Sequence, residues 1–431
     1  MTSLLSGNTV TSSSSSTLPK VVVVAYACEP LGTSEPGVGW NFIREISTFA
    51  NVWAITRSNN RDVIEAGLAA APSHMRGRVH WIYVDLPPIL TRLKKKVGFG
   101  AQLYYMLWQW KALRSCLRLN RSIKFDLSHH LTFGITWISP ALFFAGVPLI
   151  WGPIGGTYKM PRAIFSAEPI RNQIRELVYQ FVPSLLLVVS KVAKFGRRHA
   201  SAILFRTRTA EQQYPATPDS LRYVVSESAL NVDRPDFGRE LEKNYETIFA
   251  VCVGRMIYWK GFHYAIKGFK KFIENGGEGH MVLLGDGPEL PWLRKYIEEN
   301  DLGGIIQAPG KVPHERVEDI LEQANVLIHP SFRDGTSWAV LEAMRFGLPV
   351  ICLDRGGTAE VVDEECGRVL QCECPEQVIS DIAQTLEVWE KNRDLAKKLS
   401  KGAQLRIYDS YNWDSRGKQI KKIYEDVLNA N

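Results

Sequence analysis

Two runs of consecutive apolar residues, Val21–Ala27 and Ile248–Val253, constrain the fold more than any other feature of this chain. Strands that are apolar on both faces are typical of parallel sheets covered by helices on both sides. Behind each run, further short apolar runs alternate with helical patterns, and this alternation favours a doubly wound α/β sheet. Because the pattern starts twice, we expect two Rossmann-like domains that face each other across a cleft.

A polar stretch rich in charges, residues 231–246, separates the two halves and is typical of a linker. We therefore expect an N-terminal domain over residues 20–230 and a C-terminal domain over residues 247–411. A last amphipathic pattern, within residues 412–431, predicts one helix that could pack on either half. Ligands of open α/β sheets bind beyond the carboxyl ends of the strands, so the loops at those ends form the candidate site.

The composition is that of an ordinary globular protein, with 45% hydrophobic and 23% charged residues. Residues 1–19 are rich in serine and contain neither a positive charge nor an apolar core, so we expect a disordered tail rather than a targeting signal. The seven cysteines are scattered, which is typical of free thiols in a reducing compartment. No apolar run reaches the ~20 residues of a membrane span. These features predict a cytoplasmic protein that can still touch the inner face of the plasma membrane.

The most informative segment of the second half holds two carboxylates, Asp334 and Glu342, with seven residues between them. A strand pattern at 326–328 precedes it and a helical pattern from Trp338 follows it, so Asp334 is expected at a strand-to-helix crossing. Backbone N–H groups and the helix dipole at such a crossing bind anions, whereas carboxylates suit hydroxyl groups. A sugar diphosphate offers both, although a solvated helical acid is the commoner interpretation of either residue alone.

Two cations follow the strand that opens the second half. Gly254 and Arg255 end that strand, and Lys260 follows at the spacing Arg-x-x-x-x-Lys. A guanidinium supplies a planar fork and an ammonium a point charge, so together they suit a diphosphate. Surface cations are common, but the position at a strand end favours a ligand site. No Asp-x-Asp pair marks a metal site.

The first half offers two histidines and two glycines near strand ends. His129 and His130 close a strand pattern, and neighbouring residues of a strand face opposite sides. We therefore expect only one of the two to face the cleft; the alternative is a buried histidine with satisfied hydrogen bonds. Gly37 and Gly39 lie in a loop before a helix, where glycine permits close backbone approach, but a dinucleotide-binding fingerprint is incomplete.

Taken together, these motifs resemble glycosyltransferase family 4 (group 1), a retaining family with the GT-B fold. The resemblance covers most of the second half and rests on the segments Gly254–Arg255, Lys260–Gly261, Leu284–Pro288, His329–Ser331, Asp334–Ala343, Gly347–Ile351 and Gly356–Glu360. In the first half, residues 34–40, 129–132 and 151–156 are similar to a bacterial branch of that family. The family motif E-x7-E more often opens with glutamate, where this chain has Asp334. The GT-B fold further implies that the C-terminal helix crosses back to the N-terminal domain.

The resemblance implies a metal-independent transferase that uses an NDP-sugar as co-substrate and needs no cofactor. Its catalytic residues would be His130, Arg255, Lys260 and Asp334. The family usually has Asp-x-x-His-x-His, where this chain has Leu131 in place of the second histidine, and we expect His130 to face the donor sugar with His129 beside it. The donor would be bound by Gly37, Gly39, His129, Gly254, Gly335, Thr336, Ser337, Val340 and Glu342, with Glu342 on the ribose. Retention in the family is attributed to front-face attack, in which the leaving phosphate helps to remove the acceptor's proton, so no separate general base is expected.

Acceptors bind the first half in this family, which draws attention to its basic and aromatic interval. No acidic residue occurs between Asp85 and Asp126, and residues 92–124 mix lysines and arginines with aromatic residues. Residues 170–198 add apolar residues and more cations. Such mixtures suit an anionic membrane surface or a lipid-linked saccharide; a solvated helix face over a buried stripe is the alternative. No nucleic-acid-binding module is recognised, so nucleic acid is not an expected partner.

The sequence therefore predicts a hexosyltransferase that passes a sugar to a glycan or lipid-linked acceptor in envelope or exopolysaccharide assembly. One alternative is a catalytically inactive module that binds nucleotide sugars for regulation, which the retained Arg255, Lys260 and Glu342 disfavour. The other is a GT-B enzyme of different outcome, an NDP-sugar epimerase or a sucrose-type synthase.

Overall fold

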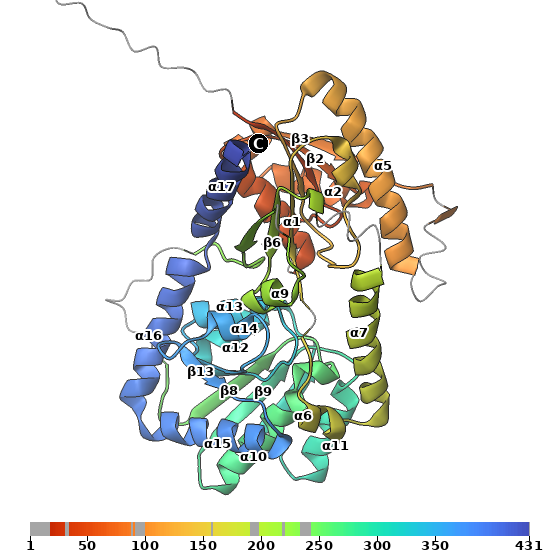
Figure 1. Ribbon diagram of the computed structural model, residues 1–431. Helices are drawn as coiled ribbons and strands as arrows, with labels where there is room; N and C mark the ends of the chain where they lie inside the picture. Colours follow the sequence, from red (N-terminus) through yellow and green to blue (C-terminus); the bar gives the residue numbers. More distant parts are fainter. Residues whose placement is uncertain are drawn as a thin grey trace, which may run out of the picture.

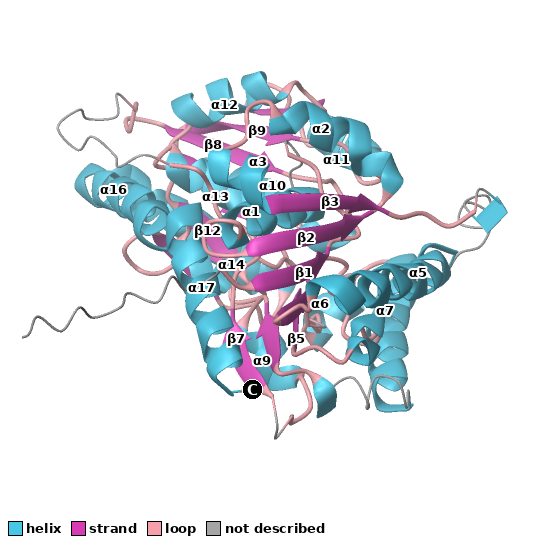
Figure 2. Ribbon diagram, turned by 90° about the horizontal axis from the view of Figure 1, so that it is seen from above, coloured by secondary structure: helices cyan, strands magenta, loops and turns pink. Residues whose placement is uncertain are grey.

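The protein folds into two lobes, which lie one above the other in Figure 1. The computed structural model describes residues 18–30, 34–87, 89–90, 100–156, 158–189, 198–217, 220–232 and 243–430. Within these residues, each lobe contains one fully parallel sheet. Helices pack on both faces of each sheet (Figure 2). This arrangement confirms the predicted GT-B architecture of two doubly wound domains.

The upper lobe holds a sheet of seven described strands in the order β3-β2-β1-β4-β5-β6-β7. Its strands are β1 (Lys20–Val24), β2 (Asn51–Thr56), β3 (Val79–Tyr83), β4 (Leu127–His130), β5 (Leu149–Ile154), β6 (Ala202–Phe205) and β7 (Leu221–Val224). Val21 and Val23 of β1 pack into one hydrophobic core, whereas Val22 and Val24 pack into another on the opposite face. A continuous apolar run is therefore what this central, doubly covered strand requires.

Helices of the first half connect these strands. They are α1 (Glu35–Ile46), α2 (Arg61–Leu68), α3 (Ser73–Arg78), α5 (Gly100–Ile123), α6 (Arg162–Ala167), α7 (Ile170–Val189) and α9 (Arg208–Gln213). The long helix α5 buries Tyr104, Tyr105 and Trp108 against one face of the sheet. Helix α1 covers the other face, where Phe42 and Ile43 are fully buried.

The lower lobe repeats the plan with a sheet of six described strands in the order β10-β9-β8-β11-β12-β13. The strands are β8 (Ile248–Val253), β9 (Gly279–Leu284), β10 (Ile306–Gly310), β11 (Val326–His329), β12 (Val350–Leu353) and β13 (Gly367–Leu370). The helices are α10 (Phe262–Glu274), α11 (Leu290–Glu299), α12 (His314–Gln323), α13 (Trp338–Arg345), α14 (Thr358–Val361), α15 (Pro375–Lys391) and α16 (Arg393–Ser410). The predicted leading strand at 248–253 thus lies inside the sheet.

The last helix, α17 (Trp413–Ala430), crosses back to the upper lobe, as the GT-B resemblance implies. Its buried residues Trp413, Ile420 and Tyr424 belong to the same hydrophobic core as β1 and α1. Figure 1 shows α17, in dark blue, beside the upper sheet. The amphipathic pattern alone left both lobes open, and the apolar face of α1 is what decides between them.

A second crossing was not expected from the sequence. Helix α6 lies in the lower lobe in Figure 1, although it is encoded in the first half. Met160 and Ile164 pack into the hydrophobic core of the lower sheet. Helix α7 runs along the same lobe. Residues 158–181 thus belong to the first half of the sequence but pack against the lower lobe. In the part of the chain that the structure describes, no helix combines the length and apolarity of a membrane span.

Candidate functional site

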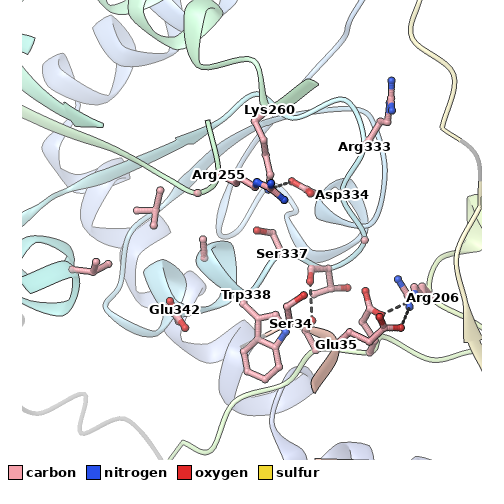
Figure 3. A pocket seen from close by; sticks show the side chains of 18 of the residues that line it. Ser34, Glu35, Arg206, Arg255, Lys260, Arg333, Asp334, Ser337, Trp338 and Glu342 are labelled. Atoms are coloured by element: carbon pink, nitrogen blue, oxygen red, sulfur yellow. Dashed lines mark hydrogen bonds and ion pairs between the residues drawn. The ribbon is translucent and has the colours of Figure 1, made fainter. Parts of the chain in front are cut away.

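A cavity of about 710 Å³ lies between the lobes, at the carboxyl ends of β8 and β11 (Figure 3). The lower lobe contributes most of its wall, through the segment after β8, the loop after β11 and the first turns of α13. The upper lobe and the segment joining the lobes contribute Ser34, Glu35, Arg206, Glu227 and Ser228. The cavity therefore has two chemically different walls.

Lys260 reaches the cavity from the short helical turn after β8 and is held there by Asp334. Its Nζ lies 2.6 Å from Asp334 Oδ2, and His329 Nε2 lies 2.7 Å from the same oxygen. Gly261 makes this close packing feasible, since its φ is +66° and a Cβ there would lie 2.2 Å from the Pro330 carbonyl oxygen. The motif Lys260-Gly261 is thus a cation together with the glycine that positions it.

Asp334 stays ionised in this environment. Burial by itself raises the pKa of its carboxyl, but the Lys260 ammonium and the His329 hydrogen bond more than reverse that effect and hold the pKa well below its usual range. In these contacts both partners approach Oδ2. Asp334 therefore fixes the position of the Lys260 ammonium at the cavity. The sequence predicts only a contact of Asp334 with the donor sugar.

Arg255 and Glu342 complete the predicted set in the lower lobe. Arg255 follows β8 and lines the cavity beside Lys260, so two cations lie on one wall (Figure 3). Glu342 lies in the second turn of α13 and lines the cavity farther along. Burial raises the pKa of Glu342, and its neighbour Glu318 adds to the shift. Such a carboxyl is placed to accept a hydrogen bond from a neutral hydroxyl.

The loop before α13 is pinned from the other side of the cavity. Ser226 Oγ lies 2.8 Å from Thr336 Oγ1, and Ser228 Oγ donates to the Thr336 carbonyl oxygen at 2.8 Å. Gly335, Thr336 and Ser337, for which the sequence predicts donor contacts, line the cavity. Their backbone lies just ahead of α13, whose first N–H groups have no partner within the helix. An anion at this helix start would meet both these groups and the two cations.

Gly356 and Gly357 pack against the backbone of Asp334. Gly356 has φ +67°, and a Cβ there would lie 2.2 Å from the Asp334 carbonyl oxygen. The Gly357 N–H donates to that same oxygen at 2.8 Å. The double glycine thus fixes the backbone of the loop that carries Asp334.

The expectation that His130 faces the cleft is wrong, and His129 does not line the cavity either. Each is at most 3% exposed. His130 Nε2 lies 2.5 Å from Tyr105 Oη of α5, on one face of the sheet. On the other face, His129 Nδ1 lies 2.7 Å from Tyr424 Oη of α17. Neighbouring strand residues do face opposite sides, but a helix covers each side, so both histidines are part of the core.

Three further predicted donor contacts lie elsewhere. Gly37 and Gly39 are buried within α1 rather than in a loop. Gly39 allows α1 to pack closely on the segment after β1, because a Cβ would lie 2.1 Å from the Ala27 carbonyl oxygen. Val340 is fully buried in the core beneath α13. Of the α1 segment, Ser34 and Glu35 line the cavity instead.

The upper wall carries a charged cluster that the sequence analysis missed. Arg206 Nε lies 2.7 Å from Glu227 Oε2, and an Arg206 guanidinium nitrogen lies 3.6 Å from Glu35 Oε1. Burial raises the pKa of Glu227 in spite of this neighbouring cation. Arg206 follows β6 and Glu227 follows β7. The sequence signal for both residues is their position after a strand, because ligands of parallel sheets bind beyond strand ends.

Arg333, the neighbour of Asp334, was also missed. It lines the cavity, but its guanidinium turns away from Lys260 in Figure 3. It pairs with Glu176 of α7 and donates to Tyr258 Oη at 2.7 Å. It also lies over the ring of Tyr179, at 3.8 Å from the centroid. Arg333 therefore ties the loop of Asp334 to a helix encoded in the other half.

Comparisons with known proteins relate the second half of the chain to one family. Residues 233–406 match the family model of glycosyl transferases group 1. An uncharacterized glycosyltransferase of Methanocaldococcus jannaschii, MJ1069, is 29% identical over 195 residues, which are 44% of this chain and 48% of that protein. The chain spans about half to two thirds of the length of the curated relatives that it matches. Residues 233–406 are thus similar to the group 1 glycosyl transferases.

Solved structures share the fold over almost the whole chain. Sucrose-phosphate synthase from Thermosynechococcus elongatus superimposes with a TM-score of 0.62 at 16% identity, covering 96% of this chain and 100% of that one. HepE from Anabaena, solved in complex with UDP-glucose, superimposes with a TM-score of 0.58 at 15% identity, covering 94% and 99%. The two-lobed GT-B arrangement seen here is therefore that of known glycosyltransferase structures.

Proposed function

We propose that this chain is a retaining hexosyltransferase that transfers a sugar from an NDP-sugar to a glycan or lipid-linked acceptor in envelope or exopolysaccharide assembly. The observation that carries the proposal is the meeting of Arg255, Lys260, the start of α13 and Glu342 around one interdomain cavity of about 710 Å³. That volume lies in the range of small-molecule sites, roughly 300–1,000 Å³.

Two parts of a nucleotide sugar, the diphosphate and the ribose, have matching groups in this cavity. The two cations and the N–H groups at the start of α13 suit the diphosphate. Glu342, farther along α13, suits the ribose hydroxyls. HepE was solved with UDP-glucose on the same fold, and a nucleoside diphosphate is the ligand class that the charges here favour.

The cations would also accelerate the reaction. As the bond between sugar and phosphate breaks, negative charge grows on the departing diphosphate. Arg255 and Lys260 are already oriented toward the cavity, so they stabilise that charge without reorganisation. Asp334 keeps Lys260 in place through the 2.6 Å contact. Retention would follow if the departing phosphate takes the acceptor's proton on the face from which the acceptor attacks.

We propose that the reaction needs no metal ion and takes place in the cytoplasm, next to the inner face of the plasma membrane. Among the described residues there is no group of three or more His, Cys, Asp or Glu side chains placed to hold a metal. In place of a metal, the two cations supply positive charge at the diphosphate.

The test begins with a thermal-shift screen of the purified chain against UDP-, GDP- and TDP-sugars. We expect stabilisation by one family of nucleotide sugars and by its free nucleoside diphosphate. Release of the nucleoside diphosphate is then followed with membrane extracts as acceptor, with and without EDTA, and NMR of the product gives the anomeric configuration.

The outcomes separate the proposal from its alternatives. Binding without turnover indicates an inactive binding module, and epimerised free sugar indicates an epimerase. An inverted product refutes retention, and a loss of turnover with EDTA refutes metal independence. If no nucleotide sugar or nucleoside diphosphate stabilises the chain, the proposal as a whole is wrong.

A further inference from the structure

Large apolar side chains that remain exposed gather on two helices, α5 and α7. On α5 they are Leu103, Met106, Leu107, Trp110 and Leu117, and on α7 they are Ile170, Ile174, Leu177, Val178 and Phe181. The exposure is substantial, reaching 75% for Ile170 and 67% for Phe181. Isolated exposed apolar residues are ordinary, but a contiguous patch marks an interaction surface.

The stripe on α5 is interleaved with cations. Its apolar residues recur at helical spacing on the face opposite the buried Tyr104 and Trp108. Trp110 stacks on the half-exposed Phe144, with ring centroids 5.6 Å apart, and this widens the patch. Arg114, Arg118 and Arg121 are exposed on the same helix, which contains no acidic residue.

The stripe on α7 has the same chemistry. Its apolar residues follow a spacing of three or four, so they lie on one face. The exposed Arg171 and Arg175 lie along one edge of that face, near the carboxyl of Glu289 just before α11. The acidic residue of the helix, Glu176, is 1% exposed and points to the opposite side, where it pairs with Arg333. The outer surface of α7 is therefore apolar, with cations along one edge.

Both helices lie on the same side of the molecule. Figure 1 shows α5, in orange, above α7, in olive, along one flank, and the view from above in Figure 2 places them together again. Helix α5 packs on the upper sheet, whereas α7 is attached to the lower lobe through Glu176 and Arg333. The two stripes thus form one flank to which each lobe contributes a helix.

We propose that the outer faces of α5 and α7 form a docking surface for an anionic lipid bilayer. Apolar side chains on a surface helix enter the boundary between head groups and acyl chains, while neighbouring arginines pair with anionic head groups. This inference rests on the proposed function and deepens it, because it names the surface on which a lipid-linked acceptor reaches the site. The inner side of α7 contacts Arg333, which lines the donor cavity.

The charges favour a bilayer over a second copy of the chain. In a symmetric dimer the same patch faces itself. The arginines of α5 would then meet those of α5 or α7 of the second copy, with no acidic residue exposed on either helix to balance them. An anionic bilayer offers both the apolar medium and the balancing charge.

The test is flotation of the purified full chain with vesicles. We expect the protein to float with vesicles rich in phosphatidylglycerol, and to float poorly with pure phosphatidylcholine or at high salt. The variants Met106→Glu/Trp110→Glu on α5 and Ile174→Glu/Phe181→Glu on α7 should each lower partitioning about tenfold or more, because apolar surface is lost and a like charge is added. Arg114→Gln/Arg118→Gln should lower it on anionic vesicles alone.

The matched control is Val388→Glu/Leu405→Glu, which changes two aliphatic side chains of similar exposure on α15 and α16. It should float like the wild type, and circular dichroism should show unchanged melting for every variant. Failure of the wild type to float with anionic vesicles overturns the inference, as does equal loss in the control. A dimer in light scattering that the α5 or α7 variants dissociate, without vesicle binding, assigns the patch to self-association.

These outcomes are separate from those of the proposed function. Flotation requires no donor and no turnover. A chain that floats as expected but binds no nucleotide sugar would keep the docking surface and lose the transferase proposal.

Discussion

Replacement of Lys260 by methionine is the sharpest test of the site. The change keeps an unbranched side chain one atom shorter and removes the ammonium, which lies 2.6 Å from Asp334 Oδ2. If Lys260 stabilises the departing diphosphate, turnover should fall about 10²–10³-fold, the range measured when one oriented donor is removed from a transition state. The nucleoside diphosphate released by wild type and variant measures this.

The same substitution has a second, independent consequence. Lys260 and Asp334 are both largely buried, at 13% and 16% side-chain exposure, so loss of this charged hydrogen bond should lower the free energy of unfolding by about 1.5–3 kcal/mol. Lys260 holds the pKa of Asp334 down, so stability from this pair is present while the carboxyl is ionised. The difference between variant and wild type should therefore shrink in acid, where Asp334 of the variant takes up its proton first.

Lys295→Met is the matched control, because Lys295 forms an exposed pair with Glu299 on α11. It should leave both turnover and urea unfolding within error of the wild type. Wild-type turnover in Lys260→Met, with the donor selected by the thermal-shift screen, would refute the assignment of Lys260 to the leaving group.

Three further predictions follow from the structure. Glu342→Gln should raise the KM for the donor roughly tenfold with little change in melting temperature. The control Glu315→Gln, on the exposed side of α12, should leave the KM unchanged. An unaltered KM in Glu342→Gln would contradict the ribose contact. Glu176→Gln leaves the buried Arg333 guanidinium without its carboxylate, so urea unfolding should show a loss of about 3 kcal/mol, against a negligible loss for Glu425→Gln in an exposed pair. Burial lowers the pKa of His129 to about 4 and that of His130 to about 3. The free energy of unfolding should therefore be unaffected by these histidines above about pH 6.5 and fall below it by about 1.4 kcal/mol per pH unit for each histidine. The reason is that the unfolded chain then binds protons that the folded chain does not. Unfolding curves that are the same at neutral and mildly acidic pH would contradict this.

The lower-lobe residues that line the cavity could be picked out from the sequence because their positions depend on local rules. Arg255 and Lys260 follow one strand and Asp334 follows its neighbour in the sheet. The carboxyl ends of adjacent parallel strands lie side by side, so residues that are distant in sequence meet without any specific knowledge of packing. That Asp334 would order Lys260 could not be read from the sequence, since it depends on a 2.6 Å contact between two loops.

In the first half, local rules do not predict which residues face the cavity. Whether a histidine at a strand end faces a cleft or a helix depends on what covers the strand. Tyr105 of α5 and Tyr424 of α17 occupy the two sides of β4. One of these tyrosines lies far away at the other end of the chain, and no local pattern around His129 and His130 indicates that it returns.

Glycine was similarly ambiguous in the first half. Gly37 and Gly39 were interpreted as part of a ligand-binding loop, and the structure places them inside α1. Gly39 is required by the close approach of that helix to Ala27. A glycine that admits a ligand and a glycine that admits another backbone look alike in a sequence.

The amino-acid sequence by itself determined the two parallel sheets, the division between them and the charges of the lower wall of the cavity, because apolar runs, helical spacing and charges after strands act over short distances. Only the tertiary structure decided which helix covers which face, that α6 and α17 cross between the lobes, and that Arg333 pairs with Glu176 of α7. Those features depend on contacts between residues far apart in the chain. The free energy of such contacts cannot be predicted from the residues around one position.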